Sequence, residues 1–225
     1  MLGSPINRKQ KGGAVASTTP RPETERKRNE ILRAAMETFG AKGSTNGTLA
    51  DIAEQVGMTH AGVLHHFGSK RALLLEVLEH RDQDDVAHLH GQHMPGGAAL
   101  FMHLVGTALR NNLRPGIVQV YTVLSAEAVT DGHPARTFFE ERYRSLRTEI
   151  EAAFRELCAS ENVGDPDTID QAAASILAVM DGLQLQWLLD PKAIELAAAT
   201  EFAIQAIVNA VLRPGPPLSS YVREP

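Results

Sequence analysis

Residues 48–70, TLADIAEQVGMTHAGVLHHFGSK, carry the pattern that decides the fold of this chain. Four apolar residues in the first part of this stretch recur at helical spacing: Leu49, Ile52, Ala53 and Val56. This spacing predicts a short helix with one apolar face. Gly57 follows where a residue with a left-handed backbone would end that helix. The stretch therefore predicts two short helices joined by a glycine-bearing turn, with a third helix that starts at Ser69.

The polar residues of the same stretch predict where its helices begin. Thr48 and Asp51 have the spacing of a capping box, in which a hydroxyl precedes a carboxylate by three residues. Thr59 can cap the second helix, whose inward positions are Val63 and Phe67. The outward positions of this second helix are small residues and imidazoles: His60, Ala61, Gly62, His65 and His66. Such a face after a tight turn is typical of the second helix of a helix-turn-helix, which lies in the DNA major groove.

The same residues resemble a known family. The segments ILRAAMETFGAKG (31–43) and TLADIAEQVGMTHAGVLHHFGSKRALL (48–74) are similar to the DNA-binding domain of the tetracycline-repressor (TetR) family. The signature positions include Ile52-Ala53, Gly57, His66-Phe67 and Ser69-Lys70, and the resemblance extends from about residue 26 to residue 75. Many members carry two tyrosines before the His-Phe pair, whereas this chain has Leu64 and His65. The resemblance implies an N-terminal DNA-binding domain and a larger helical regulatory domain.

The charge is unevenly distributed along the 225 residues, whose net charge is −5. Residues 1–81 hold 12 Lys and Arg against 8 Asp and Glu, whereas the remainder holds 10 against 19. A basic end that meets phosphate and an acidic body held away from it would give this asymmetry, although a solvated surface could give it by chance.

Beyond residue 72 the hydrophobic pattern stays helical, and we find no segment with the period-two alternation of a strand. We expect an all-α fold with an N-terminal three-helix helix-turn-helix domain and a larger helical regulatory and dimerisation domain. The first helix is predicted over residues 23–41, with Gly40 and Gly43 ending it. The expected divisions are a disordered basic arm (1–22), the DNA-binding domain (23–72), the ligand-binding and dimerisation domain (73–213) and a flexible tail (214–225).

DNA contacts are predicted in two groups. Four residues at the start of the second short helix are expected to read bases: Thr59, His60, Ala61 and Gly62. Four others are expected to contact phosphates: Thr48, His65, His66 and Lys70. The expected nucleic-acid partner is double-stranded operator DNA with a palindromic sequence.

The last two predicted helices, 169–189 and 193–212, are apolar on more than one side. A helix that is apolar most of the way round is either fully buried or packs against a second chain. The segment MDGLQLQWLLDP (180–191) also resembles the penultimate helix of the TetR-family regulatory domain, which implies a homodimer through these two helices. Ile204 and Val208 are predicted interface positions, and a monomer with a deeply buried helix is the alternative.

A small organic effector is expected to bind the regulatory domain. Ligand pockets are mostly apolar with a few placed polar groups. The apolar helical stretches contain five residues suited to such a pocket: His103, Tyr121, Met180, Gln184 and Trp187. An ordinary core could have the same composition, and His103 in particular could be a hydrogen-bonded core histidine.

Enzymatic motifs are missing from the sequence. It has no G-x-x-x-x-G-K, G-x-G-x-x-G, G-x-S-x-G or H-E-x-x-H, and no Glu is followed three residues later by His, as a helical di-metal site requires. We expect no enzyme, no cofactor and no metal site. His88, His90 and His93 cluster near Asp84 and Asp85, and a zinc site there is the alternative to a solvated helix end.

The sequence thus predicts a ligand-responsive, DNA-binding transcriptional regulator, with the repressor the usual form in this family. The alternative is a helical small-molecule-binding or interaction protein with little DNA binding. The longest apolar run, 172–180, is too short to span a bilayer and is interrupted by Ser175, and the N-terminus lacks a signal-type apolar core. We therefore expect a cytoplasmic protein without membrane contact. The effector, the operator and the sign of regulation do not follow from the sequence.

Overall fold

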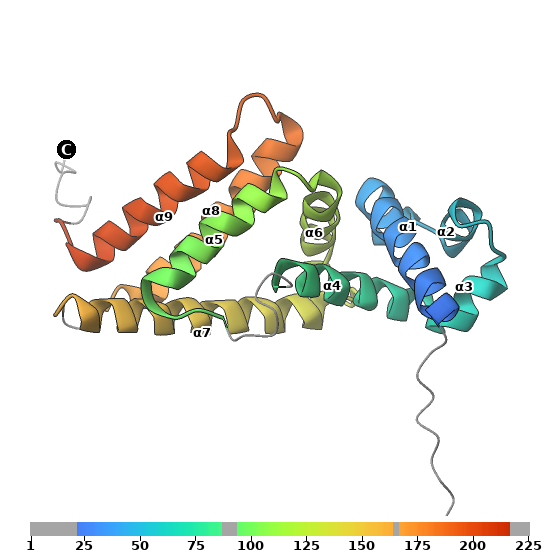
Figure 1. Ribbon diagram of the computed structural model, residues 1–225, viewed down its shortest axis with the longest axis horizontal. Helices are drawn as coiled ribbons and strands as arrows, with labels where there is room; N and C mark the ends of the chain where they lie inside the picture. Colours follow the sequence, from blue (N-terminus) through green and yellow to red (C-terminus); the bar gives the residue numbers. More distant parts are fainter. Residues whose placement is uncertain (1–21, 87–93, 164–166, 217–225) are drawn as a thin grey trace, which may run out of the picture.

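The computed structural model describes residues 22–86, 94–163 and 167–216, and all regular elements in these ranges are α-helices. The N-terminal helices are α1 (Pro22–Asn46), α2 (Leu49–Gln55), α3 (His60–Phe67) and α4 (Lys70–Val86). The other helices are α5 (Gly97–Asn111), α6 (Pro115–Glu127), α7 (Arg136–Ser160), α8 (Ile169–Leu189) and α9 (Leu196–Leu212). Helices α1–α3 form one end of the molecule, and α4 runs from that end into the body (Figure 1). The predicted all-α fold class is confirmed.

Helix α1 is longer than the sequence predicted. It continues through Gly40 to Asn46, with a non-helical backbone only at Gly43, where φ is 73° and ψ is 174°. A glycine weakens a helix by about 1 kcal/mol relative to alanine but does not end it. At Gly40 α1 lies close against α6, because a Cβ there would be 3.4 Å from the backbone nitrogen of Val120, which is ordinary van der Waals contact.

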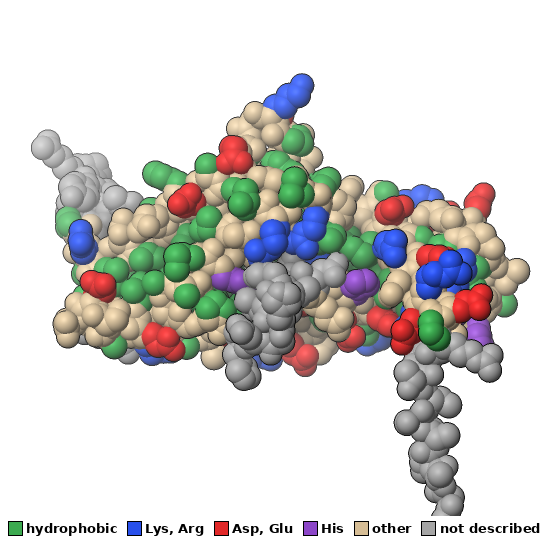
Figure 2. Space-filling view, viewed as in Figure 1, with side chains coloured by type: hydrophobic (Ala, Val, Ile, Leu, Met, Phe, Trp, Pro, Cys, Tyr) green, Lys and Arg blue, Asp and Glu red, His purple; other side chains and the backbone are tan. Residues whose placement is uncertain are grey.

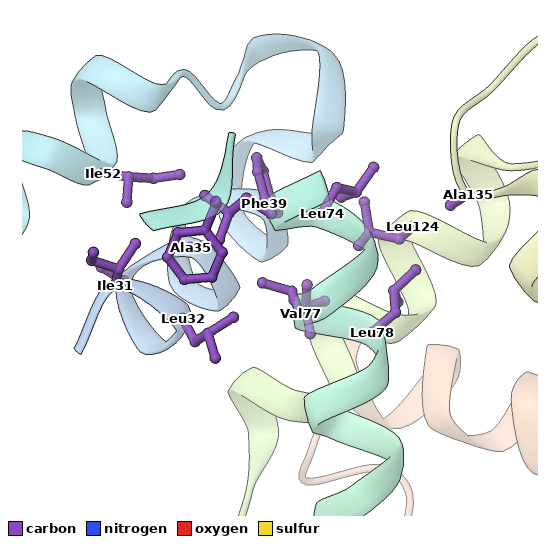
Figure 3. Close-up of a cluster of buried hydrophobic side chains, with 14 of the residues drawn as sticks. Ile31, Leu32, Ala35, Phe39, Ile52, Leu74, Val77, Leu78, Leu124 and Ala135 are labelled. Atoms are coloured by element: carbon purple, nitrogen blue, oxygen red, sulfur yellow. The ribbon is translucent and has the colours of Figure 1, made fainter. Parts of the chain in front are cut away.

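The hydrophobic core of the N-terminal helices continues into the body. Phe39 and Ile31 of α1 are fully buried with Leu74 of α4, and Leu124 of α6 and Ala135 belong to the same cluster (Figure 3). This arrangement follows from the extensive packing of α1 on α6. The N-terminal helices therefore share one core with α6 and the start of α7.

A second core holds the rest of the body together. Phe101 of α5 packs on Phe154 of α7 with their ring centroids 4.6 Å apart. Ile176 of α8 and Ile204 of α9 are buried in the same cluster. The body is thus a bundle of α5, α7, α8 and α9, and α6 lies between it and helices α1–α3 (Figure 1).

Helix α8 has the predicted bounds and packs inside this bundle. The length and mean hydropathy of α8 would by themselves allow it to cross a bilayer. This was not predicted from the sequence, because only the interrupted apolar run of residues 172–180 was considered. The helix packs instead against α9, α7 and α6, with Ile176 and Leu177 buried and Asp181 and Gln184 part of its inner face. It is therefore a core helix of the helical body.

The choice of Ile204 and Val208 as interface residues needs correction. Both side chains are buried in the core of their own chain, at 3% and 9% exposure. The large exposed apolar side chains on the last two helices are Leu185, Leu189 and Phe202. Helical periodicity gives the same stripe for a residue facing its own core and for one facing a partner, so the sequence alone did not separate the two.

Candidate nucleic-acid interface and ligand cavity

Thr48 and Thr59 begin α2 and α3 as the sequence predicted. Thr48 Oγ1 accepts a hydrogen bond from the Asp51 backbone N–H at 3.1 Å, and Asp51 Oδ2 accepts one from the Thr48 backbone N–H at 2.9 Å. Thr59 Oγ1 accepts from the Gly62 backbone N–H at 3.1 Å. Between the two helices Gly57 has φ 63°, a left-handed conformation that favours glycine. These local bonds and the turn at Gly57 fix where α2 and α3 begin.

Thr48 is engaged as a cap. Its hydroxyl also donates to Asp51 Oδ2 at 2.7 Å, so both the hydroxyl and the backbone N–H of Thr48 are directed at the same carboxylate. These hydrogen bonds hold the pKa of Asp51 well below its usual range, at about 2. A phosphate contact from Thr48 would have to break this arrangement, and we therefore leave Thr48 out of the proposed DNA contacts.

The outward face of α3 is the one expected from the sequence. Val63 and Phe67 are buried, whereas Thr59, His60 and Ala61 are exposed. Gly62 is half-buried because Met58 lies over it, with the Met58 terminal methyl 3.0 Å from where a Cβ would stand. A base edge approaching this face would meet His60 and Ala61 first.

His65 and His66 differ in their surroundings although they are neighbours. His65 is exposed, whereas His66 is half-buried with its carbonyl accepting a hydrogen bond from Arg28 Nη1 at 2.5 Å. Burial, together with the charges of His65 and Arg28, holds the pKa of His66 below its usual range. His66 is therefore suited to a neutral hydrogen bond with phosphate rather than an ion pair.

Basic side chains surround the start of α4. Lys70 Nζ donates to the carbonyl of Thr45 at 3.2 Å, which ties the first turn of α4 to the end of α1. The adjacent Arg71 is exposed. Arg71 was missed by the sequence analysis, although its position directly after Ser69-Lys70 in the family signature was the available signal. Backbone N–H groups in the first turn of a helix also favour an anion there.

The end of α1 is joined to the body by a polar contact. The Ser44 backbone N–H donates to Glu127 Oε2 at 2.7 Å, and Ser44 Oγ lies 2.7 Å from His133 Nε2. A Cβ added at Gly43 would overlap Glu127 Oε1. This contact therefore requires glycine at position 43, for its backbone conformation and for its lack of a side chain.

A cavity of about 530 Å³, partly open to solvent, lies in the body. Four of the five residues predicted to bind a ligand line it: His103, Tyr121, Met180 and Gln184. Trp187 does not line it, because it packs in a separate cluster with Ala108, Val118 and Leu196. Ligand binding by the four lining residues remains a prediction.

The polar side chains of the cavity wall join α4 to α7 and α8. Asp82 of α4 accepts from Arg81 at 3.1 Å and from Arg142 of α7. The guanidinium groups of both arginines lie over the ring of Tyr121, at 4.3 and 5.4 Å from its centroid. Both positive charges of the wall are thus held by a carboxylate and an aromatic face. Asp82 and Arg142 are 60 residues apart in the sequence, so no local motif predicts their contact.

A second polar pair in the wall consists of Tyr143 and Asp181. The Tyr143 hydroxyl donates to Asp181 Oδ2 at 2.5 Å. Burial raises the pKa of Asp181, because desolvation disfavours its charged form more than the hydrogen bond from Tyr143 favours it. Burial also raises the pKa of Tyr143, with Tyr121 and Asp181 adding to the effect.

Helix α4 connects the cavity to α3, the recognition helix of the predicted helix-turn-helix. It begins at Lys70, three residues after α3 ends at Phe67, and its Arg81, Asp82 and Gln83 line the cavity. Near its start, Arg28 of α1 binds Glu76 and lies over the ring of Phe67, 4.2 Å from its centroid. One continuous helix thus runs from the neighbourhood of α3 to the cavity wall at Asp82.

Exposed apolar side chains gather on the outside of the body. Figure 2 shows hydrophobic groups on the face formed by α5 and α9, and Phe202 of α9 is 78% exposed. Leu185 and Leu189 near the end of α8 are also exposed. No cluster of metal-ligating side chains occurs among the described residues, and the predicted group at His88, His90 and His93 lies outside them.

The capped helix pair, its exposed face and the helical body with a cavity define a helix-turn-helix regulator. Residues 31–77 match the model of the bacterial regulatory proteins of the tetR family, and residues 98–212 match the C-terminal domain of the BetI-type transcriptional repressor. The chain belongs to the TetR family of DNA-binding transcriptional regulators, which is not a family of enzymes. The predictions of family and of a non-enzymatic protein are confirmed.

Individual relatives agree with this assignment. The HTH-type transcriptional regulator BetI of Agrobacterium fabrum is 30% identical over 178 residues, which cover 77% of this chain and 82% of the relative. Among solved structures, the SmeT–triclosan complex has a TM-score of 0.68 at 17% identity, covering 84% of this chain and 93% of SmeT. The transcriptional regulator FadR from Bacillus subtilis, in complex with stearoyl-CoA, has a TM-score of 0.66 at 14% identity, covering 82% and 99%. At these identities the two structures show a shared fold.

Proposed function

We propose that this protein is a homodimeric cytoplasmic repressor that binds a palindromic operator and releases it when a small organic effector enters the cavity of the body. The observation that carries this proposal is the course of α4, which begins beside the recognition helix and contributes Arg81, Asp82 and Gln83 to the cavity wall. The alternative of a binding protein with little DNA binding is disfavoured by family membership.

The base contacts in this proposal come from Thr59, His60, Ala61 and Gly62, and the phosphate contacts from His65, His66, Lys70 and Arg71. Neutralised phosphates release counterions, so about three charged contacts per subunit give a slope of roughly −5 in log affinity against log salt. Gel-shift titrations of the protein's own promoter region at several salt concentrations measure this slope. A slope near zero would remove the phosphate contacts from the proposal.

The proposed dimer uses the exposed apolar residues of α8 and α9. Two recognition helices about 34–36 Å apart would then meet successive major grooves of the operator. Phe202→Glu places a charge on this surface and is expected to give monomers that bind the operator weakly. Val129→Glu, at an equally exposed apolar residue outside α8 and α9, is the control. Sedimentation and gel shift on both variants test the link, and a Phe202→Glu monomer with parental operator affinity contradicts it.

The effector part of the proposal rests on the cavity and its volume, which lies in the range of small-molecule sites of about 300–1,000 Å³. An effector that separates Arg142 from Asp82 would displace α4 and change the spacing of the recognition helices. Such coupling is typically 1–3 kcal/mol, or roughly 5- to 150-fold in operator affinity. Small-molecule extracts of the host, fractionated and assayed for release of operator DNA, test this step. Fractions that bind the protein equally with and without operator would show a site without coupling.

A further inference from the structure

Helix α1 carries two adjacent basic side chains that reach the ends of α2 and α3. Lys27 Nζ donates to the carbonyl of Val56, at the end of α2, at 3.0 Å. Arg28 Nη1 donates to the carbonyl of His66, in the last turn of α3, at 2.5 Å. The last four carbonyls of a helix have no partner within it, and the helix dipole places negative charge at that end. The two basic side chains therefore satisfy and stabilise both helix ends.

Arg28 has three partners at the same time. While Nη1 binds the His66 carbonyl, Nη2 binds the carboxylate of Glu76 on α4. The guanidinium also lies over the ring of Phe67, the last residue of α3, 4.2 Å from its centroid. A planar guanidinium can donate in two directions and stack on an aromatic face, whereas a lysine presents a single nitrogen. Arg28 thus joins α1, α3 and α4 at one point.

The position of this joint matters for base reading because the recognition helix is short. Helix α3 spans 8 residues, so its length is about 12 Å. The exposed residues His60 and Ala61 lie at its start, whereas Arg28 holds its end. A tilt of about 10° about the held end would move the start by about 2 Å. Such a shift exceeds the range over which a hydrogen bond to a base keeps its geometry.

We infer that Arg28 is a positioning residue for operator recognition, which sets the direction of α3 in the major groove through His66 and Phe67 without contacting DNA. Both terminal nitrogens of Arg28 are directed at acceptors within the protein, and Glu76 orients its guanidinium. The inference rests on the proposed operator binding and adds a residue on which sequence preference depends.

Arg28→Lys tests this role because it keeps the positive charge and removes the fork of the guanidinium. The matched control is Arg26→Lys, at a more exposed arginine of the same helix that lies 3.9 Å from Glu30. Affinities for the promoter fragment and for a scrambled fragment of equal length are measured by fluorescence anisotropy, well below the melting temperature of each protein. Arg28→Lys should lower affinity for the promoter fragment at least about tenfold, as expected for one charge-assisted hydrogen bond. Affinity for the scrambled fragment should change less than about twofold, and Arg26→Lys should leave both affinities at the parental values.

The ratio of the two affinities separates positioning from other roles. A contact that only stabilises the fold would lower the melting temperature and leave this ratio unchanged, because the same folded protein binds both fragments. A phosphate contact by Arg28 would weaken binding to both fragments alike. Either result, or a parental affinity for the promoter fragment in Arg28→Lys, overturns the inference.

Glu76 provides a second variant on a different helix. Glu76→Gln removes the charge that orients Arg28 and should lower the ratio about threefold, the size of a partly exposed ion pair. Glu79→Gln, at an exposed glutamate of the same helix, is the control. Because Glu76 acts through Arg28, the double variant of Arg28→Lys and Glu76→Gln should bind the promoter fragment no more weakly than Arg28→Lys alone. Losses that simply add overturn the inference.

Failure of the proposed function is distinguishable from failure of this inference. If the parent prefers the promoter fragment and Arg28→Lys keeps that preference, operator binding stands and the inference fails. If the parent binds both fragments equally, operator binding fails, and hydrogen exchange of α3 without DNA decides the role of Arg28. The amides of Val63 and Gly68, which donate to carbonyls of the preceding turn, should then exchange faster in Arg28→Lys than in Arg26→Lys. Equal exchange in the two variants overturns the inference.

Discussion

The two ends of the molecule start their helices in different ways. At the DNA-binding end, α2, α3 and α4 each begin with a hydroxyl that accepts a backbone N–H, from Thr48, Thr59 and Ser69. In the body, α5, α6, α7 and α8 begin without a side-chain cap, and α9 differs from them because Glu195 caps its first turn. The geometry of the DNA-binding helices is therefore specified by neighbours in sequence, whereas most of the body helices are positioned by packing between distant segments.

This difference coexists with a shared core. Phe39 of α1 and Leu124 of α6 belong to one hydrophobic cluster, so local specification of the DNA-binding end does not make it an independent folding unit. Helices α6 and α4 both contribute to this shared cluster, so the body and the DNA-binding end are in direct contact through them. Mutations at the DNA-binding end and in the body can test both the local caps and the shared core.

The largest effects are expected from removing a buried phenylalanine at either end. Phe39→Ala and Phe154→Ala each delete a side chain at 0% exposure and should lower the free energy of unfolding by about 3–5 kcal/mol. Because the first core spans both ends, Phe39→Ala should shift one transition of the whole protein. Urea unfolding followed by circular dichroism measures this. A separate early transition in Phe39→Ala would show that the two ends unfold independently.

The next effect concerns the contact between α1 and the body. Gly43→Val forces a β-branched residue into a backbone conformation that is essentially glycine-only and overlaps Glu127, so we expect a loss of about 1–3 kcal/mol or more. Gly116→Ala is the control, since Gly116 lies in α6 with open space around it and the added methyl favours the helix. Thermal unfolding of the two variants compares them. Equal stability would mean that the Ser44–Glu127 contact adapts freely.

The cap comparison itself is tested by two threonines. Thr48→Ala removes a capping hydroxyl and should cost about 1 kcal/mol. Thr168→Ala changes the residue before α8, whose side chain makes no cap bond, and should cost less than about 0.5 kcal/mol. Chemical denaturation of both variants gives the difference. Similar costs at the two sites would contradict the contrast between the ends.

The smallest effects are expected from two aspartates that respond to pH in opposite directions. The pKa of Asp51 is lowered to about 2 from 3.8, so its contribution to stability is present above pH 4 and is lost as the pH falls toward 2. The pKa of Asp181 is raised, so its ionisation destabilises the fold as the pH rises through the native value. Asp51→Asn should therefore destabilise and Asp181→Asn stabilise at neutral pH, with both differences shrinking in acid. The free energy of unfolding of both variants is measured between pH 2 and pH 7. A stabilising Asp51→Asn or a destabilising Asp181→Asn at neutral pH would contradict the prediction.

The contrast between local capping and distant packing explains which parts of the structure could be predicted from the sequence. The caps at Thr48 and Thr59 and the turn at Gly57 followed from spacing, because each depends on residues within a few positions. The bounds of α8 followed from its apolar pattern and the Asp190-Pro191 break. Family resemblance supplied the order of the domains and the expectation of a ligand.

Two predictions failed because they depended on contacts between distant segments. Helical spacing put Trp187 on the face of Gln184, but the end of α8 packs against α5, α6 and Leu196 rather than along the cavity. Ile204 and Val208 have the pattern of an interface stripe and face their own core. The contact of Arg142 with Asp82 joins residues 60 positions apart, and no local pattern indicates it.

The continuity of α4 has a consequence for building chimeric sensors from this protein. An α-helix turns by about 100° and advances about 1.5 Å for each residue, so one residue inserted in the middle of α4 would rotate Arg81 and Asp82 away from their partners while α3 kept its own position. A foreign ligand-binding body can therefore be grafted onto these DNA-binding helices only in the same helical phase. Inserting or deleting three or four residues at the junction in α4 nearly restores that phase, whereas a change of one or two residues does not. The position of the junction in such fusions should therefore be chosen by the helical phase of α4.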